Sequence, residues 1–314
     1  MNTPYCFKQN EMENIVTHFG KDFYDKVLRD IEVYADKWSL SSFHFIPSYS
    51  ANLVFRCDSK HFGRSVLKIG NPSGEIVKEF NTLLQYNGRK FCRVFDADME
   101  NGVLLEACVQ PGTPLRAENS LDKRLSVFCS LYKGLHIPPA KAELYPTYTE
   151  WVDRITEYMS KREDCKELFL HMQKARDICL SVSSLYSEKV LLHGDFHHDN
   201  ILLAEDEEYV MIDPKGVIGD PVFDVPRFIL NEFGEEKGTE AFNRINYIIG
   251  VFEKELHIPN SILRQCLFVE TLMGVCWCVE DGEDFFDVKK DVALAEAILC
   301  RHQPEKSCFT EMLE

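Results

Sequence analysis

A short polar loop between two apolar runs places Asp195 and Asn200 five residues apart, and Asp213 follows thirteen residues later at the end of another apolar run. A carboxylate can orient and deprotonate an acceptor hydroxyl, and an Asn–Asp pair can hold Mg²⁺ on nucleotide phosphates. The order His-x-Asp, four residues and then Asn is also the order of protein-kinase catalytic loops. We therefore predict phosphoryl transfer, with Asp195 as the base and Asn200 and Asp213 as Mg²⁺ ligands.

A lysine in a strand-like run supplies a second part of this chemistry. Lys68 lies in residues 65–69, which are similar to the strand that carries the phosphate-anchoring lysine of kinases. Such an ammonium reaches nucleotide phosphates if an opposite charge orients it, and Glu79 on the following predicted helix is the expected partner. Glu75, one turn earlier, is the alternative partner. Without other evidence, Lys68 would be read as a surface lysine and Glu79 as a solvated carboxylate. The kinase-like loop at 193–213 favours an ion pair between them instead.

The first third of the chain has the pattern of a small sheet with one helix. Strands are predicted near 43–46, 52–55, 64–69, 92–95 and 103–108, and the helix at 74–86. The apolar residues of this helix recur at helical spacing and predict one buried face made of Ile76, Phe80, Leu83 and Leu84.

The rest of the chain has a helical pattern. Helices are predicted at 119–136, 148–160, 163–186, 222–232, 238–256, 259–279 and 287–301. We expect an α+β, bilobal, protein-kinase-like fold. Residues 1–108 would form a small β-rich nucleotide-binding lobe with one helix, and residues 109–314 a larger helical lobe for catalysis and substrate binding.

The composition limits the partners of the protein. Its 51 acidic and 35 basic residues give a net charge of −16, which disfavours nucleic acid and anionic membranes and favours a cationic small molecule. Acidity of this kind also serves solubility alone. The longest apolar runs are too short to span a membrane, and the N-terminus lacks the layout of a signal peptide, so we expect a cytoplasmic protein. The sequence carries no signal for an oligomeric state.

Three histidines in the polar loop open an alternative chemistry. His193, His197 and His198 stand beside Asp195 and Asp199, as they could in a metallohydrolase. That site would need several imidazoles facing one ion, and no His-Glu-x-x-His pair is present. Phosphoryl transfer accounts for the Asn, the second Asp and the lysine together, so it is the better hypothesis.

The motifs of this region resemble those of the aminoglycoside phosphotransferase and choline kinase-like family. They are His-Gly-Asp-Phe-His-His-Asp-Asn-Ile-Leu at 193–202 and Ile-Asp-Pro-Lys-Gly-Val-Ile-Gly-Asp-Pro at 212–221. The Asp-Pro-Lys-Gly element is most similar to the branch of streptomycin 6-phosphotransferases and hydroxyurea phosphotransferases. Segments at 103–112 and 277–282 support the resemblance, which extends from about residue 48 to 282.

The resemblance implies a kinase with ATP and Mg²⁺ as cofactors and a role in antibiotic resistance. It makes Lys68 the phosphate anchor, Asp195 the base, and Asn200 with Asp213 the Mg²⁺ ligands. It also makes the main-chain groups of Glu106, Ala107 and Cys108 the contacts of adenine.

Two motifs depart from the protein-kinase pattern. The glycine-rich phosphate loop is replaced by residues 48–52, where Ser50 and Asn52 can donate hydrogen bonds to phosphate. Pro-Lys-Gly at 214–216 replaces the usual Phe-Gly, and Lys215 either contacts the transferred phosphate or pairs with a nearby acid. Asp220 and Asp224 lie at the start of a predicted helix and are expected to cap it and brace the loop of Asp195.

The acceptor pocket is expected on the helical lobe. Glu270 and Trp277 share one face of a predicted helix, and Glu280 follows, so these residues are candidate contacts for a cationic acceptor. Trp277 would otherwise belong to the core, and the acids to a solvated helix end.

Together these features predict transfer of the ATP γ-phosphate to a hydroxyl of an aminoglycoside-type, streptomycin-like acceptor. Two alternatives stay open. One is a metabolic kinase of choline, homoserine or a sugar derivative, because the acceptor pocket lies outside the motifs. The other is a nucleotide-binding pseudokinase, which the intact set of Lys68, Asp195, Asn200 and Asp213 disfavours.

Overall fold

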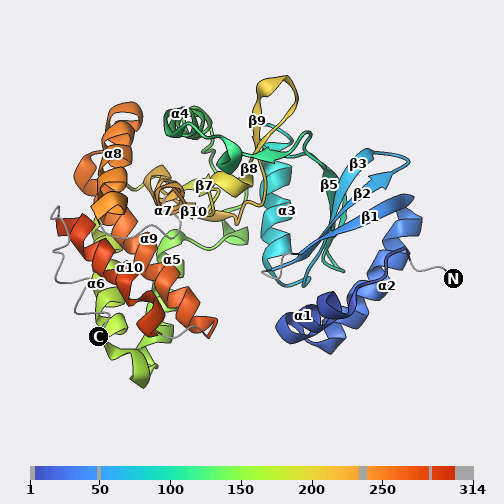
Figure 1. Cartoon of the computed structure of the whole chain (residues 1–314), viewed down its shortest axis with the longest axis horizontal. Coiled ribbons are helices and arrows are strands. Elements are labelled where there is room, and N and C mark those ends of the chain that lie inside the picture. Colours follow the sequence, from blue (N-terminus) through green and yellow to red (C-terminus); the bar gives the residue numbers. More distant parts are fainter. Residues whose placement is uncertain (1–3, 48–50, 233–238, 283–284, 301–314) are drawn as a thin grey trace. The chain divides into compact units, whose positions relative to one another are not determined.

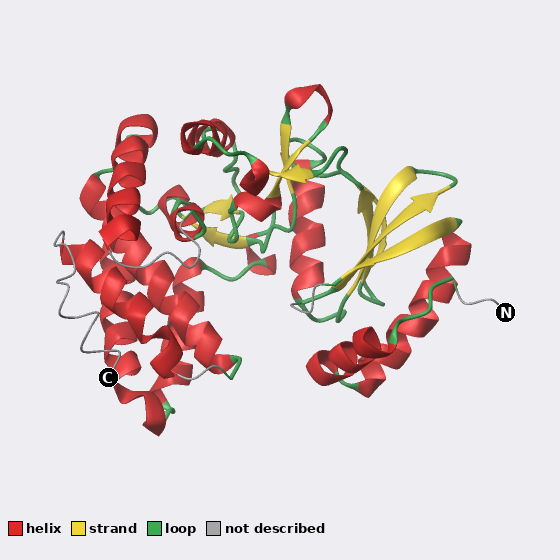
Figure 2. Ribbon diagram, viewed as in Figure 1, coloured by secondary structure: helices red, strands yellow, loops and turns green. Residues whose placement is uncertain are grey.

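The computed structural model describes residues 4–47, 51–232, 239–282 and 285–300 (Figure 1). The chain divides into two units, of which the first comprises residues 1–113 with 202–215 and the second residues 114–201 with 216–314. The first unit combines a five-stranded sheet with helices, and the second is mainly helical (Figure 2), which confirms the predicted α+β class. The boundary predicted at residue 108 falls five residues before the end of the first segment.

The first unit is built on a five-stranded antiparallel sheet in the order β1-β2-β3-β5-β4. Every predicted strand overlaps one of these strands. Their bounds are β1 (Leu40–Ile46), β2 (Leu53–Ser59), β3 (Gly63–Ile69), β4 (Val94–Asp98) and β5 (Val103–Ala107).

Two helices that the sequence interpretation lacks, α1 (Gln9–Phe19) and α2 (Lys21–Lys37), cover one face of this sheet (Figure 1). The pattern predicts one helix in this unit, whereas the structure has three among its described residues. The signal is nevertheless present in the sequence. Tyr24, Val27, Ile31 and Tyr34 recur at helical spacing and are the buried residues of α2.

The other face of the sheet carries α3 (Glu75–Tyr86), which coincides with the predicted helix. Because side chains alternate along a strand, Leu67 and Ile69 of β3 join the core under α1 and α2, and Lys68 points to the side of α3. The buried face of α3 includes Ile76 and Leu83 as predicted. The prediction is wrong for Leu84, which is 51% exposed. Each helical residue is rotated about 100° from the previous one, so Leu84 points away from the face that Leu83 buries.

Two short strands later in the chain, β8 (Ile201–Leu203) and β9 (Tyr209–Met211), explain why residues 202–215 belong to the first unit. The main-chain N–H of Gly112 donates to the carbonyl of Leu203 at 3.0 Å, close to strand β6 (Thr113–Pro114). Cys92 N–H donates to Met211 O at 3.0 Å. These bonds carry the segment that ends in Asp213 to the same unit as Lys68.

The second unit is helical, with a small antiparallel ladder of β7 (Val190–Leu192) and β10 (Val217–Gly219). Its helices overlap all seven predicted ranges. They are α4 (Leu121–Tyr132), α5 (Tyr148–Ser160), α6 (Lys166–Leu185), α7 (Pro226–Leu230), α8 (Thr239–Leu256), α9 (Asn260–Glu280) and α10 (Phe285–Cys300).

Helix α9 forms the core of this unit, where it packs against α6, α7 and α10. By length and composition alone it could cross a membrane, and it is the one such helix among the residues described. However, 72% of its apolar window is buried inside the fold, as expected for the central helix of a bundle.

Candidate functional site

Lys68 of β3 lies at the centre of a buried charge cluster in the first unit. Its Nζ is 2.5 Å from Glu79 Oε1 of α3 and 3.0 Å from Glu106 Oε1 of β5, and it also contacts Asp213 Oδ1. We call these four residues the Lys68 cluster. The predicted Lys68–Glu79 ion pair is therefore present, and Glu106 adds a side chain that the sequence interpretation used only for its main chain.

Strand register explains the presence of Glu106. In the antiparallel pairing of β3 with β5, Lys68 lies opposite Leu104 and Val66 lies opposite Glu106. Residues two apart in a strand share a face, so the side chains of Lys68 and Glu106 emerge on the same side of the sheet as diagonal neighbours. The second oxygen of Glu106 accepts a hydrogen bond from Cys92 Sγ at 3.5 Å.

Charges in the Lys68 cluster shift one another's pKa. Burial alone lowers the pKa of Lys68, but Asp213, Glu106 and Glu79 outweigh it and raise that pKa well above its usual value. Burial raises the pKa of Glu79 to about 8 and also raises that of Glu106. Burial likewise disfavours the ionised form of Asp213, yet Lys68 outweighs it and lowers the pKa of Asp213. One ammonium thus faces three carboxyl groups, a surplus of acids that suits an added cation.

The three acids lie close enough together to be candidate ligands of a metal ion, although Lys68 Nζ already contacts all three. Ligand oxygens of Glu79, Glu106 and Asp213 all lie within 4.8 Å of one another. A cavity of about 40 Å³ opens beside them, which is room for a small ion with one or two waters. Oxygen donors of this kind are the ligands that Mg²⁺ prefers. The cavity is lined by Ala51, Asn52, Val54, Lys68, Glu75, Glu79, Asp213, Pro214 and Lys215.

Five residues predicted for nucleotide or metal binding therefore line one cavity: Asn52, Lys68, Glu79, Asp213 and Lys215. Lys215 Nζ donates to Glu75 Oε2 at 2.8 Å, so the acid that was the alternative partner of Lys68 pairs with the other lysine. Ser50 lies outside the described residues.

The predicted adenine contacts lie at the end of β5. Main-chain N–H groups here are used within the sheet, since Ala107 N–H donates to Arg93 O at 2.8 Å and Cys108 N–H to Arg64 O at 3.2 Å. Glu106 directs its side chain to Lys68. A role of these residues toward adenine stays a prediction.

The loop of residues 193–200, which we call the Asp195 loop, belongs to the second unit. Asn200 Nδ2 donates to the main-chain carbonyl of Asp195 at 2.9 Å and lies 3.3 Å from Asp195 Oδ2. His197 Nε2 and Arg227 Nε lie 3.4 Å and 3.5 Å from Asp195 Oδ1. The side chain of Asp195 is 23% exposed, so its carboxylate is held from several sides yet remains open to solvent.

Asp224 braces this loop from below. One of its carboxylate oxygens accepts the N–H of His193 at 2.9 Å, and the other accepts that of Gly194 at 2.8 Å. His136 Nε2 lies 2.9 Å from the same carboxylate. Asp220 caps the next turn by accepting from Val222 N–H at 3.2 Å. Both aspartates therefore have the structural positions that the sequence predicts.

The histidines of the loop do not form a metal site. His193 is fully buried, stacks on Phe196 and accepts the N–H of Asp195 at Nδ1. His198 bonds Glu232 Oε1 at 2.7 Å, and burial lowers its pKa. In the described part of the chain, the only trio of metal-ligand side chains that converges is that of the Lys68 cluster. This arrangement disfavours the metallohydrolase alternative.

The predicted acceptor residues already hold cations of the chain itself. Glu270 is buried, and its Oε1 lies 2.8 Å from Arg227 Nη2. The same guanidinium lies 5.6 Å from the ring centroid of Trp277. Glu280 forms a two-bond pair with Arg154 at 2.7 and 2.9 Å.

Arg227 is the functional candidate that sequence reasoning missed. It lies within the predicted helix at 222–232, in a segment read there only for its aspartates. The available signal was Glu270 itself, since a carboxylate on a buried helix face requires a cation or hydrogen-bond donors nearby.

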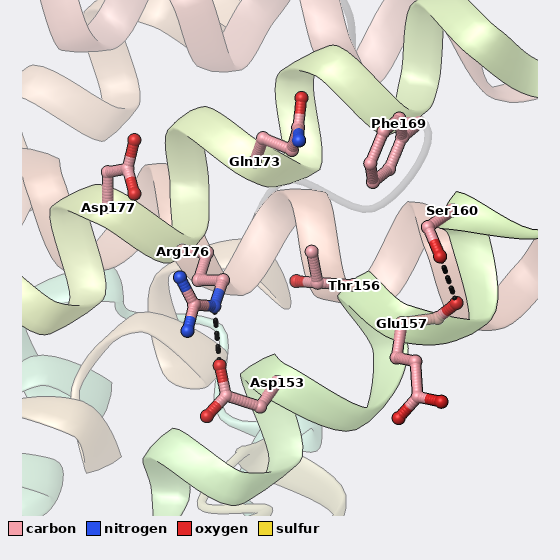
Figure 3. Close-up of a pocket in the computed structure, with 8 residues that line it drawn as sticks. All are labelled: Asp153, Thr156, Glu157, Ser160, Phe169, Gln173, Arg176 and Asp177. Atoms are coloured by element: carbon pink, nitrogen blue, oxygen red, sulfur yellow. Dashed lines mark hydrogen bonds and ion pairs between the residues drawn. The ribbon is translucent and has the colours of Figure 1, made fainter.

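A larger cavity, of about 560 Å³, lies between α5 and α6 and contains none of the predicted site residues (Figure 3). Its wall mixes acids with Arg176, whose Nε pairs with Asp153 at 2.5 Å. No buried polar group points to a ligand there in what the structure describes, so it adds nothing to the site.

The chain is similar in sequence to known kinases. The sequence model of the aminoglycoside/hydroxyurea antibiotic resistance kinases matches residues 37–282. Streptomycin 6-kinase of Streptomyces griseus is 25% identical over 272 residues, which cover 84% of this chain and 86% of that protein. Hydroxyurea phosphotransferase of Kitasatospora aureofaciens is 24% identical over 295 residues, covering 90% and 82%.

Solved structures share the fold. Choline kinase LicA from Streptococcus pneumoniae has a TM-score of 0.61 at 13% identity, covering 89% of this chain and 99% of that one. Aminoglycoside phosphotransferase APH(4)-Ia, in a ternary complex with AMP-PNP and hygromycin B, has a TM-score of 0.59 at 16% identity, covering 86% and 97%. The predicted protein-kinase-like fold is thereby confirmed.

Proposed function

Since this chain belongs to the aminoglycoside/hydroxyurea antibiotic resistance kinase family, we propose that it transfers the γ-phosphate of Mg-ATP to a hydroxyl of a streptomycin-like acceptor. Its relatives are named kinases and phosphotransferases of small molecules, so the chain is a small-molecule phosphotransferase. The observation that carries the finer proposal is the Lys68 cluster, a buried ammonium among acids beside a cavity lined by a second lysine.

The cluster would hold the phosphates of the nucleotide. Lys68, oriented by Glu79, would bind the α- and β-phosphates, and Asn52, Ser50 and Lys215 would donate to the outer phosphates. Lys215 would exchange its exposed pair with Glu75 for the nucleotide, which costs little because such surface pairs contribute weakly.

Asp213 and Asn200 would be the protein ligands of Mg²⁺, with their side-chain oxygens as donors. When bound, the ion would neutralise charge on the phosphates. Glu106 and Cys108 remain the predicted contacts of adenine.

Asp195 would act on the acceptor. Its carboxylate accepts the proton of the acceptor hydroxyl as the new oxygen–phosphorus bond forms and the bond to the leaving ADP breaks. The brace by Asp224 and the bond from Asn200 limit its motion, which favours a reactive geometry over a merely bound one.

The acceptor class rests on three considerations. Named relatives act on streptomycin and hydroxyurea, and the net charge of −16 favours a cation. Glu270, Trp277 and Glu280 remain candidate contacts. However, both acids already form ion pairs within the chain, Glu270 with Arg227 and Glu280 with Arg154. A cationic acceptor would therefore meet them only after displacing a guanidinium.

The direct experiment measures ADP release from Mg-ATP in the presence of streptomycin, other aminoglycosides, hydroxyurea, choline or homoserine. We expect strong stimulation by streptomycin and none with Asp195→Asn. Stimulation by choline or homoserine alone would replace the antibiotic acceptor with a metabolic one. Unstimulated protein that still binds ATP would contradict the proposed activity and leave a pseudokinase.

A further inference from the structure

Arg227 of α7 connects the Asp195 loop to the core of the second unit. Its Nη2 lies 2.8 Å from Glu270 Oε1, its Nε lies 3.5 Å from Asp195 Oδ1, and its guanidinium lies over the ring of Trp277. One side chain thus touches the predicted base and two residues predicted to bind the acceptor.

Glu270 fixes the far end of this connection. Its carboxylate is 3% exposed, and its second oxygen accepts a hydrogen bond from the Tyr148 hydroxyl at 2.6 Å. Tyr148 itself stacks on Phe223 at 4.3 Å. Burial by itself lowers the pKa of Arg227, but Glu270 and Asp195 outweigh it and raise that pKa, so the guanidinium stays charged. Arg227 is thus anchored on α9, and through Glu270 on Tyr148 of α5, and neither helix belongs to the loop.

The Nε of Arg227 is the one nitrogen of this guanidinium that is buried without a hydrogen bond to any described residue. A buried donor without an acceptor is unfavourable, and Asp195 Oδ1 at 3.5 Å is a small movement away from completing the bond. Such bonds are often long before substrate binds and shorten in the reactive complex.

We infer that Arg227 is a positioning residue: anchored by Glu270, it holds the carboxylate of Asp195 toward the acceptor hydroxyl. Its guanidinium also occupies the place between Glu270 and Trp277 where the sequence predicts a cation of the acceptor. The inference rests on the proposed function only in taking Asp195 as the base. A role for Glu270 as the direct receptor of a substrate cation is the competing account.

The first test needs no substrate. A double-mutant cycle of Arg227→Met and Asp195→Asn is measured by urea unfolding of the full chain. The cycle keeps the wild-type Glu270, because the cost of leaving its buried carboxylate without a cation appears in both legs of the cycle and cancels. We expect the two losses to be non-additive, with a coupling of about 3-fold or more in the folding equilibrium constant. Additive losses would overturn the contact.

The second test separates positioning from stability. With streptomycin and Mg-ATP, Arg227→Met should lower kcat by about 100-fold and leave KM for ATP within about 2-fold, as expected for a displaced catalytic group. Arg227→Lys should recover only part of that loss, because it restores the charge but not the fork of nitrogens that reaches both carboxylates.

A matched control is Arg264→Met. Arg264 is a buried arginine of α9 that bonds Asn260, Asn246 and the carbonyl of Ile298, and none of these is a predicted site residue. Its kcat per folded molecule should stay within about 2-fold of wild type. An equal loss of kcat in Arg264→Met and Arg227→Met would reduce Arg227 to a structural role. If the wild type phosphorylates no acceptor, the proposed function fails, and the unfolding cycle still decides the fate of the Arg227–Asp195 contact.

Discussion

The Lys68 cluster and the Asp195 loop solve opposite electrostatic problems. In the cluster, three carboxyl groups surround one ammonium, and burial raises the pKa of two of them. Around the loop, each acid has at least two donors: Asp224 accepts two main-chain N–H groups, and Glu232 binds Arg124 and His198. The cluster therefore offsets its surplus of acids partly by binding protons, whereas the loop is held by donors of the chain itself.

The largest expected effect lies in the loop. Asp195→Asn should lower kcat by about 10³-fold, because it removes the group that accepts the hydroxyl proton, and should leave ATP affinity unchanged. Steady-state kinetics and calorimetric titration with Mg-ATP measure the two quantities. Asp199→Asn is the control, since Asp199 belongs to the same loop but pairs with Arg116, and we expect it to lose less than about 10-fold. Normal turnover in Asp195→Asn would remove Asp195 from the role of base.

The next effect lies in the cluster and concerns binding. Asp213→Ala should lower nucleotide affinity by about 100-fold in Mg²⁺, because it removes a predicted ligand of the ion and a partner of Lys68. Calorimetry with and without EDTA separates the two roles, since a metal ligand matters only while the ion is present. An equal loss of affinity in EDTA would contradict the metal assignment.

A smaller effect tests the preorganisation of the loop. Asp224→Asn weakens two main-chain bonds to the loop and should lower the free energy of unfolding by about 2 kcal/mol. It should also lower kcat at unchanged KM for ATP. Asp220→Asn, which weakens the main-chain bonds that Asp220 accepts from Val222 and Glu188, should cost stability and leave kcat intact. If both variants behave alike, the brace has no specific function.

The smallest effect is a difference in pH dependence, measured by urea unfolding in Mg²⁺-free buffer. Glu79 has a folded pKa of about 8 against an ordinary 4.5, so between these values the folded state binds the extra proton. Stability from this group is lost as pH rises through that window, by at most about 1.4 kcal/mol per pH unit. Glu79→Gln should flatten the curve there.

Glu232 has the opposite sign. Burial alone raises its pKa, but Arg124 and His198 outweigh burial and lower it, so its contribution is present at neutral pH and is lost as pH falls below its ordinary value. Glu232→Gln should flatten the acidic side of the curve. Identical shifts in the two variants would mean that the two regions do not differ as described.

Local patterns predicted most helices and strands of this fold and missed α1 and α2. Helix α5 begins and ends at the predicted residues, because Thr147 and Glu150 form a capping box and its apolar residues follow a helical period. The sequence also predicted that Asp195 and Asn200 share one loop, because residues five apart in the chain cannot lie far apart in space.

Long-range partners could not be predicted in the same way. The contact of Glu106 with Lys68 depends on the register of β3 against β5, which no local pattern fixes. The pairing of Arg227 with Glu270 joins residues 43 positions apart on different helices. The pattern of Glu270 beside Trp277 correctly indicated that a cation binds there. Only the packing shows that this cation is Arg227 of the same chain.

The most direct test of phosphoryl transfer is ³¹P NMR of the full-length protein with Mg-ATP and streptomycin. We predict that a phosphomonoester resonance grows in step with ADP and is absent with Asp195→Asn. Formation of ADP with inorganic phosphate alone, or unchanged ATP in a protein that binds it, would contradict the account.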